Sequence, residues 1–420
     1  MTISLLRGDF ALVWWSGLIS MTGSWMLSAA LPAFVYLTTR SVLAASLMFV
    51  ASLLPRVLLG GWAGSLADRY DRRVLLAALN ALAALSLLPL LALDARSLWL
   101  VYVVEVLETL VLLPLGPAEN SLLPALVSND TLPRANALNA LNNNLARLVG
   151  PALGGVMLTW GGLDLVVLVD VASYVLAALL IWRVRYRGAK SMTSEEPVKR
   201  AWRSGLAVVW RSSALRLLTL AMAVGAIGEG VFGVLLAPFV TSVLGGDARA
   251  YGLVISAQAI GGLVGGVVAA RYAHRWEAAR LLTWGSVGLG LVDLAMFVYP
   301  LWLPIVPPAV ALMVLAGIPA SFSGAAWATL MQRHASDAVR GRAFGVAGQL
   351  SAVGVFAGVG IANLAREAAW IVPVISTHAA TLLLGGILLG ALGRRAGLWS
   401  RGEVDLDGRG AAPARSQSEG

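Results

Sequence analysis

The segment Gly64-Ser65-Leu66-Ala67-Asp68-Arg69-Tyr70-Asp71-Arg72-Arg73 is a short charged cluster between two long apolar runs. Three arginines and two aspartates fall within residues 68–73, whereas the flanking residues are mainly Leu, Val, Gly and Ala. Charged side chains are costly inside a bilayer, so a cluster of this kind is expected at a membrane surface. The segment therefore predicts a loop between two membrane-spanning helices.

The composition independently indicates a membrane protein. Hydrophobic residues make up 58% of the chain and charged residues 13%, whereas a soluble domain carries about 25% charged residues. The 45 glycines suit close packing of helices in lipid. Cysteine is absent, which excludes disulfides, thiolate metal sites and cysteine nucleophiles.

Apolar stretches of about 20 residues, the length that crosses a bilayer as a helix, predict an all-α membrane protein with twelve transmembrane helices in two six-helix bundles. The predicted spans are 10–37, 43–66, 74–93, 98–127, 142–160, 164–183, 215–241, 250–270, 281–300, 305–331, 343–365 and 370–393.

The distribution of basic residues predicts the orientation. With the N-terminus in the cytoplasm, all but five of the 31 Lys and Arg residues lie in cytoplasmic segments or at cytoplasmic helix ends; the five are Arg40, Arg56, Arg96, Arg249 and Arg366. The net charge of +9 is therefore assigned to anchoring and topology and not to nucleic-acid binding. We expect a multi-pass protein of a prokaryotic cytoplasmic (inner) membrane with both termini cytoplasmic.

The polar segments divide the chain into four parts. We predict an N-terminal bundle at 1–183, a cytoplasmic linker at 184–214, a C-terminal bundle at 215–393 and a disordered cytoplasmic tail at 394–420. Within the linker, Val198 to Trp210 alternates basic and apolar residues, as an amphipathic surface helix does. An internal repeat supports two halves, since a shift of 202 positions aligns Gly64, Arg69, Tyr70 and Arg73 with Gly266, Arg271, Tyr272 and Arg275.

A second motif, Ala146-Arg147-Leu148-Val149-Gly150-Pro151-Ala152-Leu153-Gly154-Gly155, opens the fifth span. Pro151 removes a backbone donor and bends the helix. Gly150, Gly154 and Gly155 permit a close neighbour. The motif predicts a bent helix packed tightly against another.

Together these motifs resemble the major facilitator superfamily of transporters. The charged segment resembles the family's loop between helices two and three, and the Gly-Pro stretch with Arg147 resembles the antiporter motif of its exporters. With Arg134-Ala135-Asn136-Ala137 and Asp170-Val171-Ala172-Ser173, the chain is similar over nearly its whole length to the branch that includes drug, macrolide and enterobactin (siderophore) exporters.

The resemblance implies a conformational latch at the charged segment. The latch begins at Gly64, and Asp68 matches the family's carboxylate that caps helix eleven. The family's basic positions, which pair with an acidic group on helix four, are matched by Arg69, Arg72 and Arg73. Their expected acidic partner in this chain is Glu119. This chain departs from the family by having Asp71 where Gly is common. The alternative is that the arginines only anchor the loop at anionic headgroups.

Ionisable residues inside the spans are the candidates for proton coupling or for recognition of a cationic substrate. Glu105, Glu108, Glu229 and Arg56 are assigned to this role. Asp170 and Asp293 lie on spans that are peripheral in the family, so a structural role is expected for them. The alternative for the glutamates is a buried salt bridge with Arg56 or Arg147.

Aromatic and polar residues on the cavity-lining spans predict a site for amphipathic molecules. Its residues are Trp25, Gln258, Phe322 and Trp327. For Trp14, Trp15 and Trp99 the expected role is instead that of anchors at the membrane interface.

Several function classes are excluded. Neither Lys190 nor Lys199 belongs to a P-loop, so an ion gradient and not ATP is the expected energy source. The scattered histidines argue against a metal site, and no cofactor or enzymatic activity is expected.

The predicted function is a monomeric secondary transporter, a proton-coupled efflux antiporter that exports a small amphipathic compound (drug, macrolide or siderophore) by alternating access. The alternatives are a lipid or lysophospholipid flippase of the same fold, or a membrane sensor that does not transport.

Overall fold

The computed structural model describes most of the chain, and the ranges are 8–94, 96–128, 131–185, 198–272, 276–335, 339–365 and 367–399. Within these ranges the chain forms helices joined by short turns and contains no strand. The predicted all-α fold is therefore confirmed. The predicted tail residues 400–420 and linker residues 186–197 lie outside the described part.

The helices follow the predicted spans closely. Those of the first half are α1 (Asp9–Thr39), α2 (Val42–Arg69), α3 (Arg72–Leu87), the 3₁₀ turn η2 (Leu88–Ala92), α4 (Trp99–Leu112), α5 (Leu115–Leu126) and α6 (Leu132–Trp182). Those that follow are α7 (Val198–Arg211), α8 (Ser213–Pro238), the π-helical turn η3 (Phe239–Val243), α9 (Ala248–Tyr272), α10 (Ala278–Val298), η4 (Tyr299–Leu301), α11 (Val306–His334), α12 (Arg340–Ala362) and α13 (Ala368–Gly393).

Twelve membrane crossings result, because α6 contains two of them. The described residues hold eleven helices that are long and apolar enough to cross a membrane, with α6 counted once. Gly162, inside α6, has φ 67° and ψ −167°, a non-helical conformation that residues with a Cβ rarely adopt. The break at Gly162 falls between the fifth and sixth predicted spans.

The fourth span differs from the single helix that the sequence predicts. It is divided into α4, which ends at Leu112, and α5, which begins at Leu115. Pro114 lies at the junction and cannot donate a backbone hydrogen bond, which accounts for the break.

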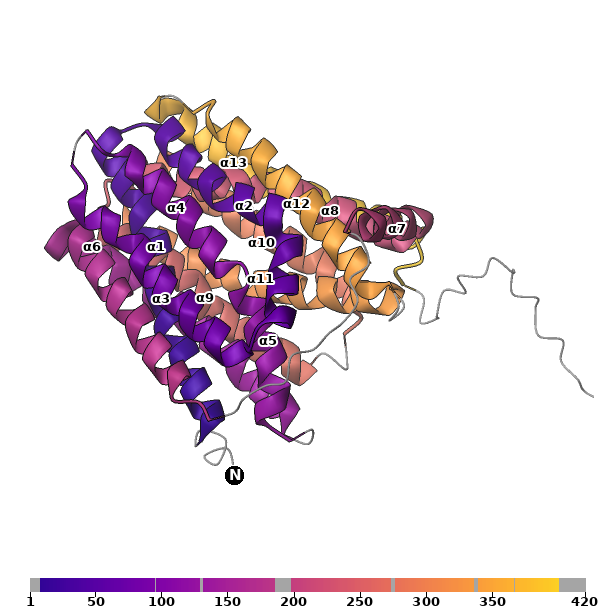
Figure 1. Ribbon diagram of the computed structural model, residues 1–420. Coiled ribbons are helices and arrows are strands. Elements are labelled where there is room, and N and C mark those ends of the chain that lie inside the picture. The colour runs from indigo at the N-terminus through magenta and orange to yellow at the C-terminus, as the bar shows by residue number, and fades with distance from the viewer. Residues whose placement is uncertain are drawn as a thin grey trace, which may run out of the picture.

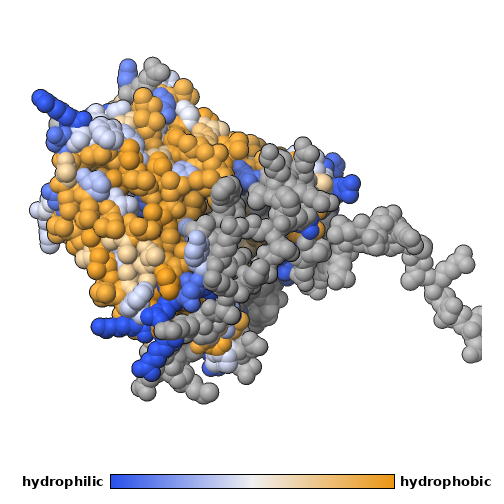
Figure 2. All heavy atoms as spheres, viewed as in Figure 1, coloured by the Kyte–Doolittle hydropathy of each residue, from blue (hydrophilic) through white to orange (hydrophobic). Residues whose placement is uncertain are grey.

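The exterior of the bundle is apolar, as lipid contact requires. Figure 2 shows a broad hydrophobic surface with hydrophilic residues gathered toward its ends. Large apolar side chains stand out from it, including Trp302, which is 78% exposed, and Trp284, which is 70% exposed. A soluble protein rarely exposes a continuous apolar surface as broad as the one in Figure 2.

Helix α7 lies at the edge of the bundle, beside α8 and α12 (Figure 1). A Cβ added at Gly205 of α7 would lie 2.9 Å from the carbonyl oxygen of Arg342, so α7 packs closely on the start of α12. Its bounds coincide with the predicted amphipathic segment. The division into two bundles and a linker stays a prediction.

The two halves are in contact at the distal end of the bundle, defined here as the end where α1 stops and α2 begins. The Tyr36 and Ser242 hydroxyls lie 2.9 Å apart, and the Asn363 amide donates to Ser46 Oγ at 2.9 Å. The largest apolar core also joins Ala33 of α1 to Phe239 of the second half. The opposite, proximal end carries the start of α1 and the end of α13.

Candidate functional site

The first half buries a carboxyl cluster between α1, α4 and α6. The Tyr174 hydroxyl donates to Glu108 Oε1 at 2.8 Å and lies 2.8 Å from Ser24 Oγ. Glu108 is 8% exposed and Tyr174 is fully buried. A carboxylate deprived of water must find hydrogen-bond donors, and here a neutral hydroxyl supplies one.

Asp170 extends this cluster along α6. It accepts a hydrogen bond from Ser173 Oγ at 3.0 Å, while its Oδ2 atom has no partner. Gly23 of α1 faces Asp170 and Ser173 so closely that a Cβ would overlap both side chains. The glycine thus allows α1 and α6 to approach over a buried carboxyl group, and the structural role expected for Asp170 stays a prediction.

Glu105 lies one helical turn before Glu108, and the charges of the two groups interact. The positive charge of Arg56 on α2 acts on both glutamates. Arg56 itself is exposed. The predicted coupling residues of the first half are therefore gathered in one region, with a tyrosine hydroxyl and not an arginine in direct contact with Glu108.

The second half holds a different cluster, in which an imidazole lies between two carboxylates. His378 Nε2 of α13 lies 3.6 Å from Glu229 Oε1 of α8, and His378 Nδ1 lies 3.4 Å from Asp293 Oδ2 of α10. The side chains of His378 and Asp293 are 4% and 2% exposed, whereas that of Glu229 is 60% exposed. The ring centroid of Phe232 lies 5.0 Å from that of His378.

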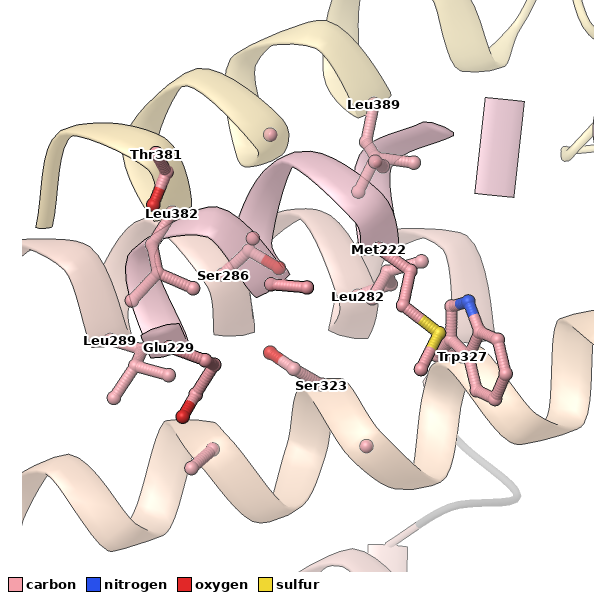
Figure 3. A pocket seen from close by; sticks show the side chains of 16 residues that line it. Met222, Glu229, Leu282, Ser286, Leu289, Ser323, Trp327, Thr381, Leu382 and Leu389 are labelled. Atoms are coloured by element: carbon pink, nitrogen blue, oxygen red, sulfur yellow. The ribbon is translucent and has the colours of Figure 1, made fainter. Parts of the chain in front are cut away.

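Glu229 borders a cavity of about 340 Å³ inside the second half. The lining comes from α8, α10, α11 and α13 and is mostly apolar. Figure 3 shows Glu229 and Ser323 directed into this space, with Met222 and Trp327 farther along it. The arrangement places one carboxylate in the wall of an otherwise apolar cavity, which suits binding of a proton or of an amphipathic cation.

Arg147 connects the halves near this cluster. Its guanidinium donates to Gln258 Oε1 of α9 at 2.6 Å and lies over the Trp25 ring at 5.6 Å. Its charge also acts on Glu229. Arg147, Trp25 and Gln258, which the sequence assigns to two separate sites, are thus brought together between α1, α6 and α9.

The glycines after Arg147 face two different helices. A Cβ at Gly150 would lie 2.6 Å from the Trp25 Cβ, and Gly154 is closer still to the Met26 carbonyl, so both face α1. Gly155 instead faces the Ala248 carbonyl of α9. A hydrogen bond from the Ala152 amide to Ser256 Oγ, 3.0 Å long, adds to the contact with α9.

In the charged segment between α2 and α3, Asp71 is the N-cap of α3. Its Oδ1 accepts from the backbone amides of Arg73 and Val74 at 3.0 and 3.1 Å, which explains an aspartate at this position. Arg73 donates to the Trp182 carbonyl and lies over the Trp182 ring.

The other latch positions are less fully placed. Glu119 is half-buried on α5, and the predicted pairing of the arginines with it stays a prediction. Gly64 and Arg69 fall within α2, but the side chains of residues 60–69, Asp68 included, lie outside the described part.

The aromatic residues predicted to line one substrate site are dispersed. Trp327 borders the cavity of the second half and donates to the Leu218 carbonyl at 3.3 Å. Phe322 packs edge-on against Trp276 at 5.9 Å between centroids. The prediction that Trp14 anchors the chain at the membrane interface is wrong. Its side chain is only 7% exposed and its indole donates to the Leu138 carbonyl, so Trp14 is a core residue.

Sequence reasoning missed His378 and Tyr174. His378 was weighed with the other histidines as a metal ligand, and the three are indeed far apart in the chain. Its position inside an apolar span was the available signal, because an ionisable residue there is a functional candidate by default. Among the described residues, no group of three or more His, Cys, Asp and Glu is arranged to hold a metal ion.

The described residues contain eleven helices that are long and apolar enough to cross a membrane, one of them broken into two at Gly162, and this defines a multi-pass membrane protein. The chain belongs to the Major Facilitator Superfamily, whose family model matches residues 13–359. The family match assigns it to transporters and not to enzymes.

Relatives of known structure or activity support this assignment. The chain is 28% identical over 402 residues, covering 91% of this chain and 95% of the relative, to the multidrug efflux pump Tap of Mycolicibacterium fortuitum. Its fold is similar to the peptide transporter POT in complex with sulfate (TM-score 0.76, 14% identity, 94% and 96% of the two chains). It is also similar to a bacterial homologue of the iron transporter ferroportin in the inward-facing state (TM-score 0.73, 15% identity, 91% and 98%).

Proposed function

We propose that this transporter exports small amphipathic molecules from a prokaryotic cytoplasm in exchange for protons. The similarity to a multidrug efflux pump over nearly the whole chain supports export of such compounds. The protein would act as a monomer in the cytoplasmic membrane, with both termini and the proximal end of the bundle on the cytoplasmic side. Drugs, macrolides and siderophores are the candidate cargoes.

The observation that carries the proposal is Glu229. This carboxylate is 60% exposed and borders a largely apolar cavity, close to the imidazole of His378 and within the electrostatic reach of Arg147. Proton antiport can be based on a carboxylate that binds a proton in one state and an arginine or a cationic cargo in another. Glu108, held by Tyr174 in a buried cluster, is the weaker candidate for this role.

Alternating access is supported by where the halves touch. The contacts of Tyr36 with Ser242 and of Asn363 with Ser46 close the distal end, which corresponds to a cytoplasm-facing state. In the outward-facing state these contacts, and that of Arg147 with Gln258, would break. The segment from Gly64 to Arg73 would then act at the cytoplasmic side as the latch between states.

The test uses inside-out vesicles that contain the protein and are energised to acidify the lumen. Ethidium, a fluorescent amphipathic cation, is added first, followed by a macrolide. We expect uptake coupled to proton efflux from the lumen, and its loss in Glu229→Gln. The matched control is Glu277→Gln, which removes a surface carboxylate paired with Arg280 and should transport normally. Uptake in Glu229→Gln equal to wild type would contradict the assignment.

The flippase is the alternative function. An apolar groove of about 570 Å³ lies between α3 and α6. Its lining comes from two segments of the first half, within residues 74–88 and 171–182. The groove is lined by apolar side chains, as contact with an acyl chain requires, but its lining comes from one half alone and is separate from the Glu229 cavity. Lysophospholipid translocation without uptake of any drug by folded protein would favour the flippase, and ligand binding without transport would favour the sensor.

A further inference from the structure

The cluster of the second half joins three helices through His378. Glu229 on α8 lies on one side of the imidazole and Asp293 on α10 on the other, at 3.6 and 3.4 Å. Arg147, on α6, is another charged group between the halves, where its guanidinium donates to Gln258. The order Glu229, His378, Asp293 therefore leads from a group exposed to the cavity to a group that is 2% exposed.

The polar atoms of this cluster are not satisfied in the present state. Neither ring nitrogen of His378 has a hydrogen-bond partner, and neither does Asp293 Oδ2. Ser323 Oγ, which faces the same cavity from α11, is also without a partner. Buried polar groups are normally hydrogen-bonded, and His378 lacks a partner at both ring nitrogens, whereas His334 is without one at Nδ1. Close contacts that lack hydrogen-bond geometry suit groups that engage in one state and separate in another.

Phe232 and Phe297 pack beside the imidazole, with ring centroids 5.0 and 6.2 Å from it. In such an apolar enclosure, an unpaired charge is costly, so a proton on His378 needs a carboxylate beside it. Asp293 and Glu229 supply two. The enclosure thus permits a proton on the ring while excluding direct contact with a large cargo.

The cavity extends from Glu229 toward the proximal end of the second half. Met222 and Glu229 are seven residues apart on α8, about 10 Å along the helix, and Met222 is nearer the proximal end. Trp327 and Leu389 border the same space near the proximal ends of α11 and α13. Figure 3 shows this course from Trp327 and Met222 to Glu229.

We propose that His378 is the proton carrier of this transporter, and that protons reach it through the cavity inside the second half while the cargo passes between the halves. The proposal rests on the proposed function and names the group that couples it. The Glu229 carboxyl gives its proton to the neutral Nε2 of His378, leaving a carboxylate and an imidazolium. The Nδ1–H of that imidazolium donates to the Asp293 carboxylate, and the reverse transfer releases the proton through the cavity.

Asp293 acts in this scheme as a positioning residue. Its carboxylate holds the Nδ1–H side of the ring, so that Nε2 faces Glu229. Loss of that carboxylate should move the pH profile of transport and leave ethidium binding unchanged. A purely structural aspartate would instead change the amount of folded protein at every pH alike.

The experiment compares His378→Gln and Asp293→Asn with wild type in two assays on the same vesicles. The first is proton-driven accumulation of ethidium, and the second is ethidium counterflow with no gradient, which needs the cargo path but no net proton movement. The matched control is His334→Gln, because His334 is the other buried histidine of the described chain. We expect His378→Gln to lose accumulation at least tenfold and to keep counterflow within twofold, Asp293→Asn to shift the pH profile, and His334→Gln to match wild type.

A measurement on the wild-type residue covers the case in which His378→Gln does not fold. The chain has three histidines, so His274→Gln/His334→Gln leaves His378 alone. In this protein, purified without a histidine tag, the ¹⁵N chemical shifts of the imidazole report its protonation. We expect the imidazolium without ethidium and the neutral ring at saturating ethidium, at the same pH.

The outcomes separate the two proposals. If wild type accumulates ethidium with proton efflux and His378→Gln does so equally, the carrier assignment is wrong and the antiport stands. A ring that keeps one protonation state with and without ethidium also overturns the assignment. If wild type shows no proton-driven uptake of ethidium or of a macrolide, the proposed function falls, and the coupling role of His378 falls with it.

Discussion

The two halves place a polar side chain of their last helix against a glycine of their first helix, but they differ in the chemistry that surrounds it. In the first half, Gly23 of α1 faces Asp170 of α6. In the second half, Gly228 of α8 faces His378 of α13. The glycine of the first helix thus faces an acid in one half and a base in the other.

This difference is the basis for proposing a structural role for the buried charge of the first half and a coupling role for that of the second. In the first half the neutral hydroxyl of Ser173 donates to Asp170 and that of Tyr174 donates to Glu108, so each carboxyl group has a hydroxyl partner, although Asp170 Oδ2 has none. Around His378 a base stands between two carboxylates in close contacts that lack hydrogen-bond geometry, beside a cavity. Proton exchange needs a base and a path, and the second half has both.

The largest expected effect is on ethidium accumulation when one carboxylate of each half is neutralised. One charge moved across 100 mV is worth about 2.3 kcal/mol, or roughly fiftyfold in accumulation. Glu229→Gln should lose about this factor in ethidium accumulation, whereas Glu108→Gln should keep most of it. The measurement is the steady-state ratio of lumenal to external ethidium at a fixed gradient. A larger loss in Glu108→Gln would move the coupling site to the first half.

The second prediction compares the two glycines. A Cβ at Gly228 would lie 2.8 Å from the Cα of His378, which is backbone and cannot yield without moving α13. A Cβ at Gly23 would overlap only the side chains of Asp170 and Ser173. Overpacking costs about 1–3 kcal/mol, so Gly228→Ala should lower the melting temperature of the purified protein more than Gly23→Ala does. Equal shifts would show that the two helix contacts tolerate a methyl group alike.

The sequence was sufficient for the helices and for their breaks where glycine marks them. Apolar length places every span, and Gly162 falls between the fifth and sixth. The break at Pro114 was missed because a proline is often tolerated in a membrane helix, so its presence does not fix a boundary.

The site was only partly predictable. Glu229 and Arg147 were found because charge in an apolar span is conspicuous. That His378 lies between Glu229 and Asp293 depends on how α8, α10 and α13 are rotated about their axes. Sequence periodicity gives the lipid-facing side of a helix but not which residue of a neighbour it meets. The same limit explains the wrong prediction for Trp14, because the sequence does not show that its indole packs inside the bundle and donates to the Leu138 carbonyl.

The third prediction concerns the proton path. Gly324 of α11 lines the cavity, and a Cβ there would meet nothing within 4 Å, so Gly324→Leu should fill the space without displacing a helix. We expect proton release on ethidium binding to slow several-fold while counterflow is kept. Gly360→Leu on α12, where a Cβ also meets nothing within 4 Å, is the control. Unchanged proton release in Gly324→Leu would show that protons leave by another route.

The smallest expected effect tests the first half directly. Tyr174→Phe removes the hydroxyl that bonds Glu108 and Ser24 while keeping the ring in the core. The loss of these two hydrogen bonds costs about 1 kcal/mol each, so the melting temperature should fall by a few degrees.

Transport by Tyr174→Phe should nevertheless stay within twofold of wild type, because the hydroxyl fixes a carboxyl group and does not pass a proton. The matched control is Tyr102→Phe, which loses a single 3.2 Å bond to the Ala44 carbonyl and should be perturbed less. If Tyr174→Phe instead lost accumulation as severely as His378→Gln, the first half would carry protons as well. The contrast between a fixed cluster and an exchanging one would then be wrong.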